Sequence, residues 1–85
     1  MECRVSTPNW TKTVKVKEIV IDSGEGVLRI YPQHTDIVSS IKVNSNLSLR
    51  LNDGRVFNLK CNQGILKIES NKALILIDTD EKDIL

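Results

Sequence analysis

Residues 47–61 read LSLRLNDGRVFNLKC, and this stretch decides the fold class. Before the central turn leucine occupies every second position, and after it apolar side chains again alternate with polar ones. Such alternation is typical of strands with one buried and one exposed face. Asp53-Gly54 supplies the pair of residues with positive φ that a tight type I′ turn requires. The stretch therefore predicts an antiparallel two-stranded hairpin.

The same alternation continues outward from this hairpin. Val14 and Val16 alternate with lysines, and the apolar phase then slips by one position at Glu18, ahead of residues 19–21. This slip predicts a β-bulge or a strand buried on both faces. A second hairpin turns at residues 70–72. The further expected strands share the extended pattern and cover residues 3–6, 27–31, 36–43, 65–69 and 73–78.

No part of the chain sustains a helical period for three turns, and no linker or repeat divides its 85 residues. We therefore expect a single all-β domain, residues 1–85, with about eight mostly antiparallel strands, a number and spacing typical of a sandwich or a barrel. The residues that hold the apolar phase of their strands should form the core. They are Leu28, Ile30, Leu49, Leu59, Leu66, Ile68 and Leu76.

Charge and hydropathy exclude several classes of protein. The formal net charge is +1, with lysines and arginines scattered among acids, so the basic excess of a general nucleic-acid or anionic-membrane binder is lacking. The apolar runs are far shorter than the ~20 residues of a spanning helix. Residues 1–5 contain Glu2 and Arg4, where a signal peptide would be apolar. We expect no nucleic-acid partner, no membrane insertion and no export.

Few residues offer reactive chemistry. Cys3 and Cys61 have no CxxC spacing, and His34 has no neighbouring metal ligand, so neither a disulfide framework nor a metal site is expected. No nucleophile and base stand at the spacing of a known catalytic motif, and residues 24–26 form a bare GxG in a turn. We therefore expect no catalytic centre and no cofactor. His34 suits either a half-buried hydrogen-bonding role or an interface.

Two ordered motifs carry a resemblance. The strand at residues 16–21 is followed by SGEG at 23–26 and by LRIYPQHTDIV at 28–38. This order resembles the EGELGI(L/Y)PGHAPL segment of the epsilon subunit of the F-type ATP synthase. The segment NQGILKI at 62–68 is similar to that family's GG(F/I)LEV segment. The resemblance extends over essentially all 85 residues.

Shorter matches support this assignment. Asn71 and Asp78 stand where that family has a turn asparagine and the end of a VTVLAD strand, and Ser6-Thr7-Pro8 stands where it has T-P or S-P/A. The resemblance implies the N-terminal β-sandwich of the subunit, with about eight to ten mostly antiparallel strands in two sheets. Such a domain sits at the foot of the rotating central stalk and contacts the gamma subunit and the c-ring. It is a non-catalytic part that helps couple proton or sodium flow to ATP synthesis.

The resemblance also implies where partners bind and where the protein works. The ring-facing positions it implies are Glu25, Gly26, Val27, Leu28 and Arg29. The gamma-facing positions it implies are Ser6, His34 and Ser39. The location it implies is the cytoplasmic face of the bacterial inner membrane, or the organellar equivalent, within a peripheral complex.

Some positions depart from the family pattern. Val27 replaces a second acid, Gln33 replaces the glycine of PGH, and Val43-Asn44 replaces a usual Pro-Gly. Family members commonly continue into a two-helix hairpin that inhibits ATP hydrolysis and in some members binds ATP. The sequence ends at Leu85. We therefore expect either a naturally short form of the subunit or an excised domain, in both cases without that control.

One alternative function belongs to a different class. A free-standing β-sandwich could recruit a peptide by strand addition, or an acidic partner through its scattered lysines. Recovery of gamma and c subunits with the chain would decide between the two functions.

Overall fold

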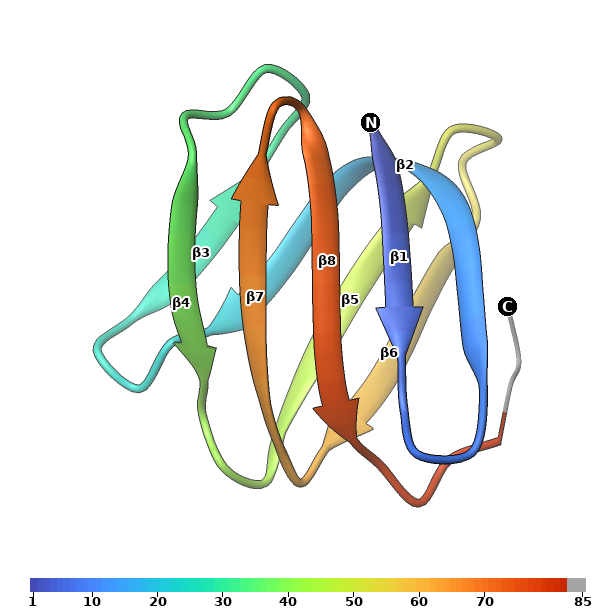
Figure 1. Cartoon of the computed structure of the whole chain (residues 1–85), viewed down its shortest axis with the longest axis vertical. Coiled ribbons are helices and arrows are strands. Elements are labelled where there is room, and N and C mark those ends of the chain that lie inside the picture. Colours follow the sequence, from blue (N-terminus) through green and yellow to red (C-terminus); the bar gives the residue numbers. More distant parts are fainter. Residues whose placement is uncertain (83–85) are drawn as a thin grey trace.

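The structure is a computed structural model that describes residues 1–82. Eight strands account for its regular structure, within the expected range, and the described residues contain no helix (Figure 1). The all-β prediction is confirmed. The strands are β1 (Glu2–Ser6), β2 (Thr11–Asp22), β3 (Val27–Ile30), β4 (Ile37–Ile41), β5 (Ser45–Leu51), β6 (Val56–Cys61), β7 (Gln63–Glu69) and β8 (Lys72–Asp78).

The strands form two layers. The first sheet has the order β4-β7-β8-β1-β2, and the second sheet has the order β3-β2-β5-β6. All neighbours are antiparallel except β1 and β8, which run parallel. Figure 1 shows the strands of the first sheet in front and those of the second sheet crossing obliquely behind them. This arrangement is a β-sandwich, as expected.

Strand β2 belongs to both sheets because it contains a bulge. Val16 lies opposite Leu51 and Glu18 lies opposite Arg50, so Lys17 is an extra residue without a partner. A bulge bends its strand and increases its twist. The first half of β2 therefore pairs with β1, and its second half pairs with β3 and β5. Of the two alternatives predicted from the phase slip at Glu18, the structure contains the bulge.

The core lies between the two sheets. Five of the seven predicted core residues are fully buried: Ile30, Leu49, Leu59, Leu66 and Ile68. Leu28 is half-buried and packs against this core. Leu76 is 44 % exposed, so its assignment to the core was wrong. Strand β8 buries Ala73, Ile75 and Ile77, which places Leu76 on the outer face.

The two predicted hairpins are present, but their turns differ from expectation. The hairpin of β5 and β6 has a three-residue loop, residues 52–54, in which only Gly54 has a positive φ, of 93°. Its amide donates to the Leu51 carbonyl at 3.0 Å. The predicted type I′ turn is therefore wrong here. That geometry occurs between β7 and β8, where Ser70 and Asn71 have φ values of 52° and 61°.

Candidate docking surfaces

The loop between β2 and β3 carries the tip of the predicted ring-facing segment. The Gly24 amide donates to Asp22 Oδ1 at 2.9 Å, and the Ser23 amide donates to the Gly26 carbonyl at 2.9 Å. Gly24 and Gly26 have φ values of 86° and 146°, which side chains with a Cβ rarely adopt. The glycines thus allow a tight, hydrogen-bonded loop that presents Glu25 to solvent.

The remaining ring-facing positions alternate along β3. Val27 and Arg29 are exposed on the outer face of the second sheet, whereas Leu28 turns inward and is half-buried. Arg29 Nη1 lies 3.6 Å from Glu18 Oε2. Glu25, Gly26, Val27 and Arg29 can therefore meet a partner without unfolding. Leu28 is the one member of the set that is packed against the core.

His34 lies in the loop between β3 and β4. Its Nδ1 is 2.7 Å from the Thr35 carbonyl oxygen, so Nδ1 carries the proton in this hydrogen bond. The loop is tied to the turn between β7 and β8 because the Ser70 amide donates to Asp36 Oδ1 at 3.1 Å. Figure 1 shows the loop and the turn at the same end of the molecule. His34 is thus half-buried in an anchored loop.

The edges of β3 and β4 enclose an open cleft of about 480 Å³. Glu25 and Leu28 line it from the side of β3, and His34 and Ser39 line it from the side of β4. Two residues predicted to face the ring thus share one cleft with two residues predicted to face gamma. This juxtaposition comes from the closing of the sandwich and has no counterpart in sequence spacing.

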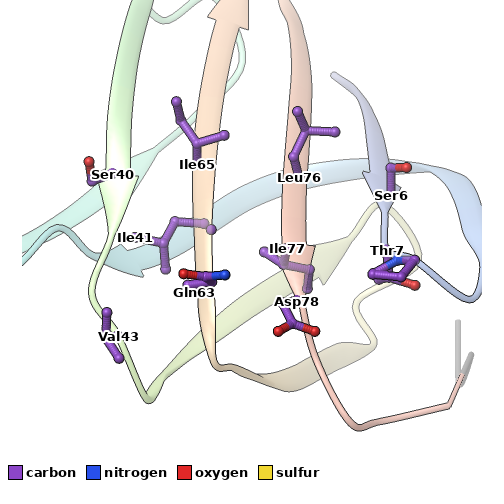
Figure 2. A pocket seen from close by; sticks show the side chains of 12 residues that line it. Ser6, Thr7, Ser40, Ile41, Val43, Gln63, Ile65, Leu76, Ile77 and Asp78 are labelled. Atoms are coloured by element: carbon purple, nitrogen blue, oxygen red, sulfur yellow. The ribbon is translucent and has the colours of Figure 1, made fainter.

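Ser6 lies elsewhere, on the outer face of the first sheet. The strand register places Ser6 beside Leu76 of β8. Leu76 lies beside Ile65 of β7, and Ile65 lies beside Ser40 of β4. We call these four residues, Ser40, Ile65, Leu76 and Ser6, the outer row. Figure 2 shows their side chains at an open hollow of about 670 Å³. Ser39, one position from this row, is half-buried and donates through Oγ to the Ser40 carbonyl at 3.0 Å.

The outer row contains two exposed apolar residues that the sequence analysis did not identify as surface residues. Ile65 is 40 % exposed and Leu76 is 44 % exposed, although both lie in the middle of paired strands. Val43, which is also exposed, lines the same hollow. The sequence did contain a signal for exposed apolar residues, because residues 73–77 are all apolar. A strand with one buried face needs an apolar residue only at every second position, so the remaining apolar residues of this run must lie on the outer face. Adjoining exposed apolar side chains favour an interaction surface.

The two cysteines and the potential metal ligands lie apart within residues 1–82. Cys3 and Cys61 are both buried free thiols, and burial raises the pKa of Cys3 to about 12. In residues 1–82 no three side chains of the metal-binding types come together. Across the same described part of the chain, no helix has the length and apolar character needed to cross a membrane.

These features, a two-sheet sandwich with an exposed hydrogen-bonded loop and an apolar hollow on one sheet face, define a β-sandwich domain with two candidate docking surfaces. The chain belongs to the family of ATP synthase delta/epsilon chains, because the family model of their beta-sandwich domain matches residues 1–83. The resemblance seen in the sequence is confirmed.

Individual relatives support this membership. The chain is 31 % identical over 83 residues to the ATP synthase epsilon chain of Clostridium botulinum, which covers 96 % of this chain and 62 % of that protein. It is 29 % identical over 87 residues to the chloroplastic epsilon chain of Pinus thunbergii, covering 99 % and 61 % respectively. The chain thus spans less than two thirds of the length of these relatives.

Solved structures show the same fold. A chain of the Tetrahymena thermophila mitochondrial ATP synthase central stalk and c-ring superposes with a TM-score of 0.79 at 15 % identity, covering 92 % of this chain and 63 % of that one. A chain of the Euglena gracilis mitochondrial ATP synthase superposes with a TM-score of 0.72 at 16 % identity, covering 93 % and 49 %. At these identities the likeness establishes the fold alone.

Proposed function

We propose that the chain is a non-catalytic central-stalk component of an ATP synthase that links gamma to the c-ring and helps couple proton or sodium flow to ATP synthesis. Family membership over residues 1–83 supports this function. The observation that carries it is the outer row, where Ile65 and Leu76 stand exposed in the middle of a sheet. Exposed apolar side chains that adjoin one another favour an interaction surface.

The proposed task demands a body that deforms little under torque. Strand β2 pairs with β1, β3 and β5, so one continuous strand joins the two layers. The interior between the layers is filled by fully buried aliphatic side chains from both sheets. Close packing of this kind has low compressibility. A stiff sandwich of this kind would transmit a push on one surface to the other.

We assign the two partners to two surfaces. The outer row around Ser6, together with His34 and Ser39 at the neighbouring cleft, faces gamma. The exposed loop and strand at residues 25–29 face the c-ring. The domain then works as part of a peripheral complex at the cytoplasmic face of a bacterial membrane, or at its organellar equivalent, without inserting into the bilayer.

Reconstitution with purified gamma subunit and c-ring tests this function. The wild-type chain should co-purify with both partners. Leu76→Asp should weaken recovery with gamma, and the double variant Val27→Asp, Arg29→Glu should weaken recovery with the c-ring. Val27→Asp alone should leave the melting temperature nearly unchanged, because changes at exposed positions usually stay within about ±0.5 kcal/mol. Arg29→Glu also removes one of the two guanidiniums beside Glu18, so the folding of the double variant is checked by circular dichroism before recovery is compared. Failure of the wild-type chain to recover either partner would contradict the function and favour a free-standing binding module.

A further inference from the structure

A nearly hidden carboxylate lies at the centre of the outer face of the second sheet. Glu18 Oε2 is 3.6 Å from Arg29 Nη1, and Glu18 Oε1 is 3.6 Å from Arg50 Nη2. The Glu18 side chain is 10 % exposed, whereas those of Arg29 and Arg50 are 61 % and 52 % exposed. Each carboxylate oxygen therefore meets one guanidinium, and both guanidiniums remain open to solvent.

The bulge in β2 creates this arrangement. By inserting Lys17 it turns Glu18 to the outer face, directly opposite Arg50 on β5. Arg29 comes from the other side, on β3. Tyr31, which follows β3, donates a hydrogen bond that lowers the pKa of Glu18, and the two arginines lower it further. Glu18 thus stays ionised at neutral pH. We call Glu18, Arg29, Tyr31 and Arg50 the arginine cluster.

The two guanidiniums of the arginine cluster have more N–H donors than the Glu18 carboxylate can accept from. Each guanidinium carries five N–H groups, and the one carboxylate meets each of them by a single long contact and not by a two-pronged pair. Two positive charges face one negative charge, which leaves one positive charge unmatched. Tyr31 beside the cluster is 50 % exposed. Arginine and tyrosine are among the residue types enriched at the positions that contribute most to binding at protein interfaces.

We propose that the arginine cluster is a docking site for one carboxylate side chain of a partner protein. The proposal rests on the proposed function, because Arg29 belongs to the ring-facing segment, and it names the chemistry that this face recognises. One unmatched positive charge suits one carboxylate. An anionic membrane would instead need a broad basic face, and here Asp22 lies on the same outer face, next to Val20 on β2. Glu18 is a positioning residue that holds both guanidiniums side by side.

A hexaglutamate peptide is a suitable probe for the 85-residue chain, with binding followed by NMR of the arginine Nε–H groups. We expect the signals of Arg29 and Arg50 to shift on titration. Arg50→Gln should weaken binding about tenfold, as expected for the loss of one charge-assisted hydrogen bond. Glu18→Gln should tighten binding several-fold because it removes the competing negative charge, although its single amide oxygen can accept from only one of the two guanidiniums.

Arg55→Gln is the matched control. Arg55 is also exposed and also pairs with one carboxylate, with its Nε 2.7 Å from Asp53 Oδ2, but it lies at the tip of the hairpin of β5 and β6. This variant should bind hexaglutamate like the wild type. An equal loss of affinity in Arg55→Gln and Arg50→Gln would show that only overall charge matters and would overturn the site. Wild-type affinity in both Arg29→Gln and Arg50→Gln would overturn it too.

The proposed function can fail separately from the carboxylate site. If the wild-type chain recovers gamma and c-ring and Arg50→Gln recovers them equally well, the site is wrong and the function stands. If the wild-type chain recovers neither, while hexaglutamate binding follows the expected order of variants, the function is wrong and the site stands. Arginine-dependent binding to phosphatidylglycerol vesicles without hexaglutamate binding would assign the cluster to a membrane and overturn the proposal.

Discussion

The backbone amide of Gln33 donates a 2.8 Å hydrogen bond to Asn71 Oδ1, which joins two positions that are 38 residues apart. Both residues have left-handed backbone angles, with φ of 68° for Gln33 and 61° for Asn71. Gln33 and Asn44, whose φ is 57°, stand where the family pattern has glycine. The backbone geometry that favours glycine is therefore retained at both positions, although the glycines themselves are replaced.

Replacing Gln33 by glycine should stabilise the fold. A left-handed conformation costs a residue with a Cβ about 1–2 kcal/mol, and the extra flexibility of glycine in the unfolded chain offsets about 0.5–1 kcal/mol of that. We expect Gln33→Gly to raise the free energy of unfolding by about 0.5–1 kcal/mol, measured by urea denaturation. Gln33→Ala keeps the strain and should match the wild type. A glycine variant less stable than the alanine variant would contradict this explanation.

Two substitutions at Asn71 should separate its backbone role from its side-chain role. Asn71→Gly keeps the left-handed turn and loses only the hydrogen bond from Gln33, so we expect a cost of about 0.5–1.5 kcal/mol. Asn71→Ala loses both and should cost about 1–3 kcal/mol. Hydrogen exchange of the Gln33 amide should accelerate in both variants. Equal unfolding free energies for the two variants would mean that the turn geometry contributes nothing.

Two leucines in paired strands should respond very differently to truncation. Leu49 is fully buried, so Leu49→Ala should lower the free energy of unfolding by about 2–5 kcal/mol. Leu76 is 44 % exposed, and Leu76→Ala should cost less than about 1 kcal/mol. Denaturant titration of both variants measures the difference. Similar losses would place Leu76 in the core after all.

The single tyrosine of the chain offers a direct readout of the arginine cluster. The hydrogen bond to Glu18 raises the pKa of Tyr31 above its ordinary 10.0. Because the folded state holds this proton more tightly, the contact stabilises the fold below pH 10 and is lost as the pH rises through the raised pKa. Glu18→Gln should move the tyrosinate absorbance titration to lower pH. Arg55→Gln should not move it.

Acid should remove the contribution of Glu18. Its pKa is lowered from 4.5, chiefly by the Tyr31 hydrogen bond, so its stabilising contribution is present above pH 4.5 and is lost as the pH falls through the lowered value. The difference in melting temperature between wild type and Glu18→Gln should stay constant above about pH 5 and shrink below it. A difference that persists unchanged in acid would mean that Glu18 is not held ionised by its neighbours.

Candidate surface residues were only partly accessible to sequence reasoning. The resemblance indicated residues 25–29, and the structure exposes all of them except Leu28. The pairing of Arg50 with Glu18 could not be predicted, because the two positions are 32 residues apart and meet only through the register of β2 and β5. The same reason hid the shared cleft of Glu25 and His34, which belong to loops at the edges of different sheets.

The sequence by itself determined the all-β class, the hairpin at residues 47–61 and the interruption of the strand pattern at Glu18, because alternation and its interruption are relations between neighbouring residues. Only the tertiary structure decided which face of residues 73–77 is buried. In an unbroken apolar run no alternation of apolar and polar residues distinguishes the inner face from the outer one. The tertiary structure also decided the turn at Gly54, where the register of the flanking strands selects three loop residues over two. Contacts between strands depend on the register in which the strands pair, and the pattern of neighbouring residues in the sequence does not specify that register.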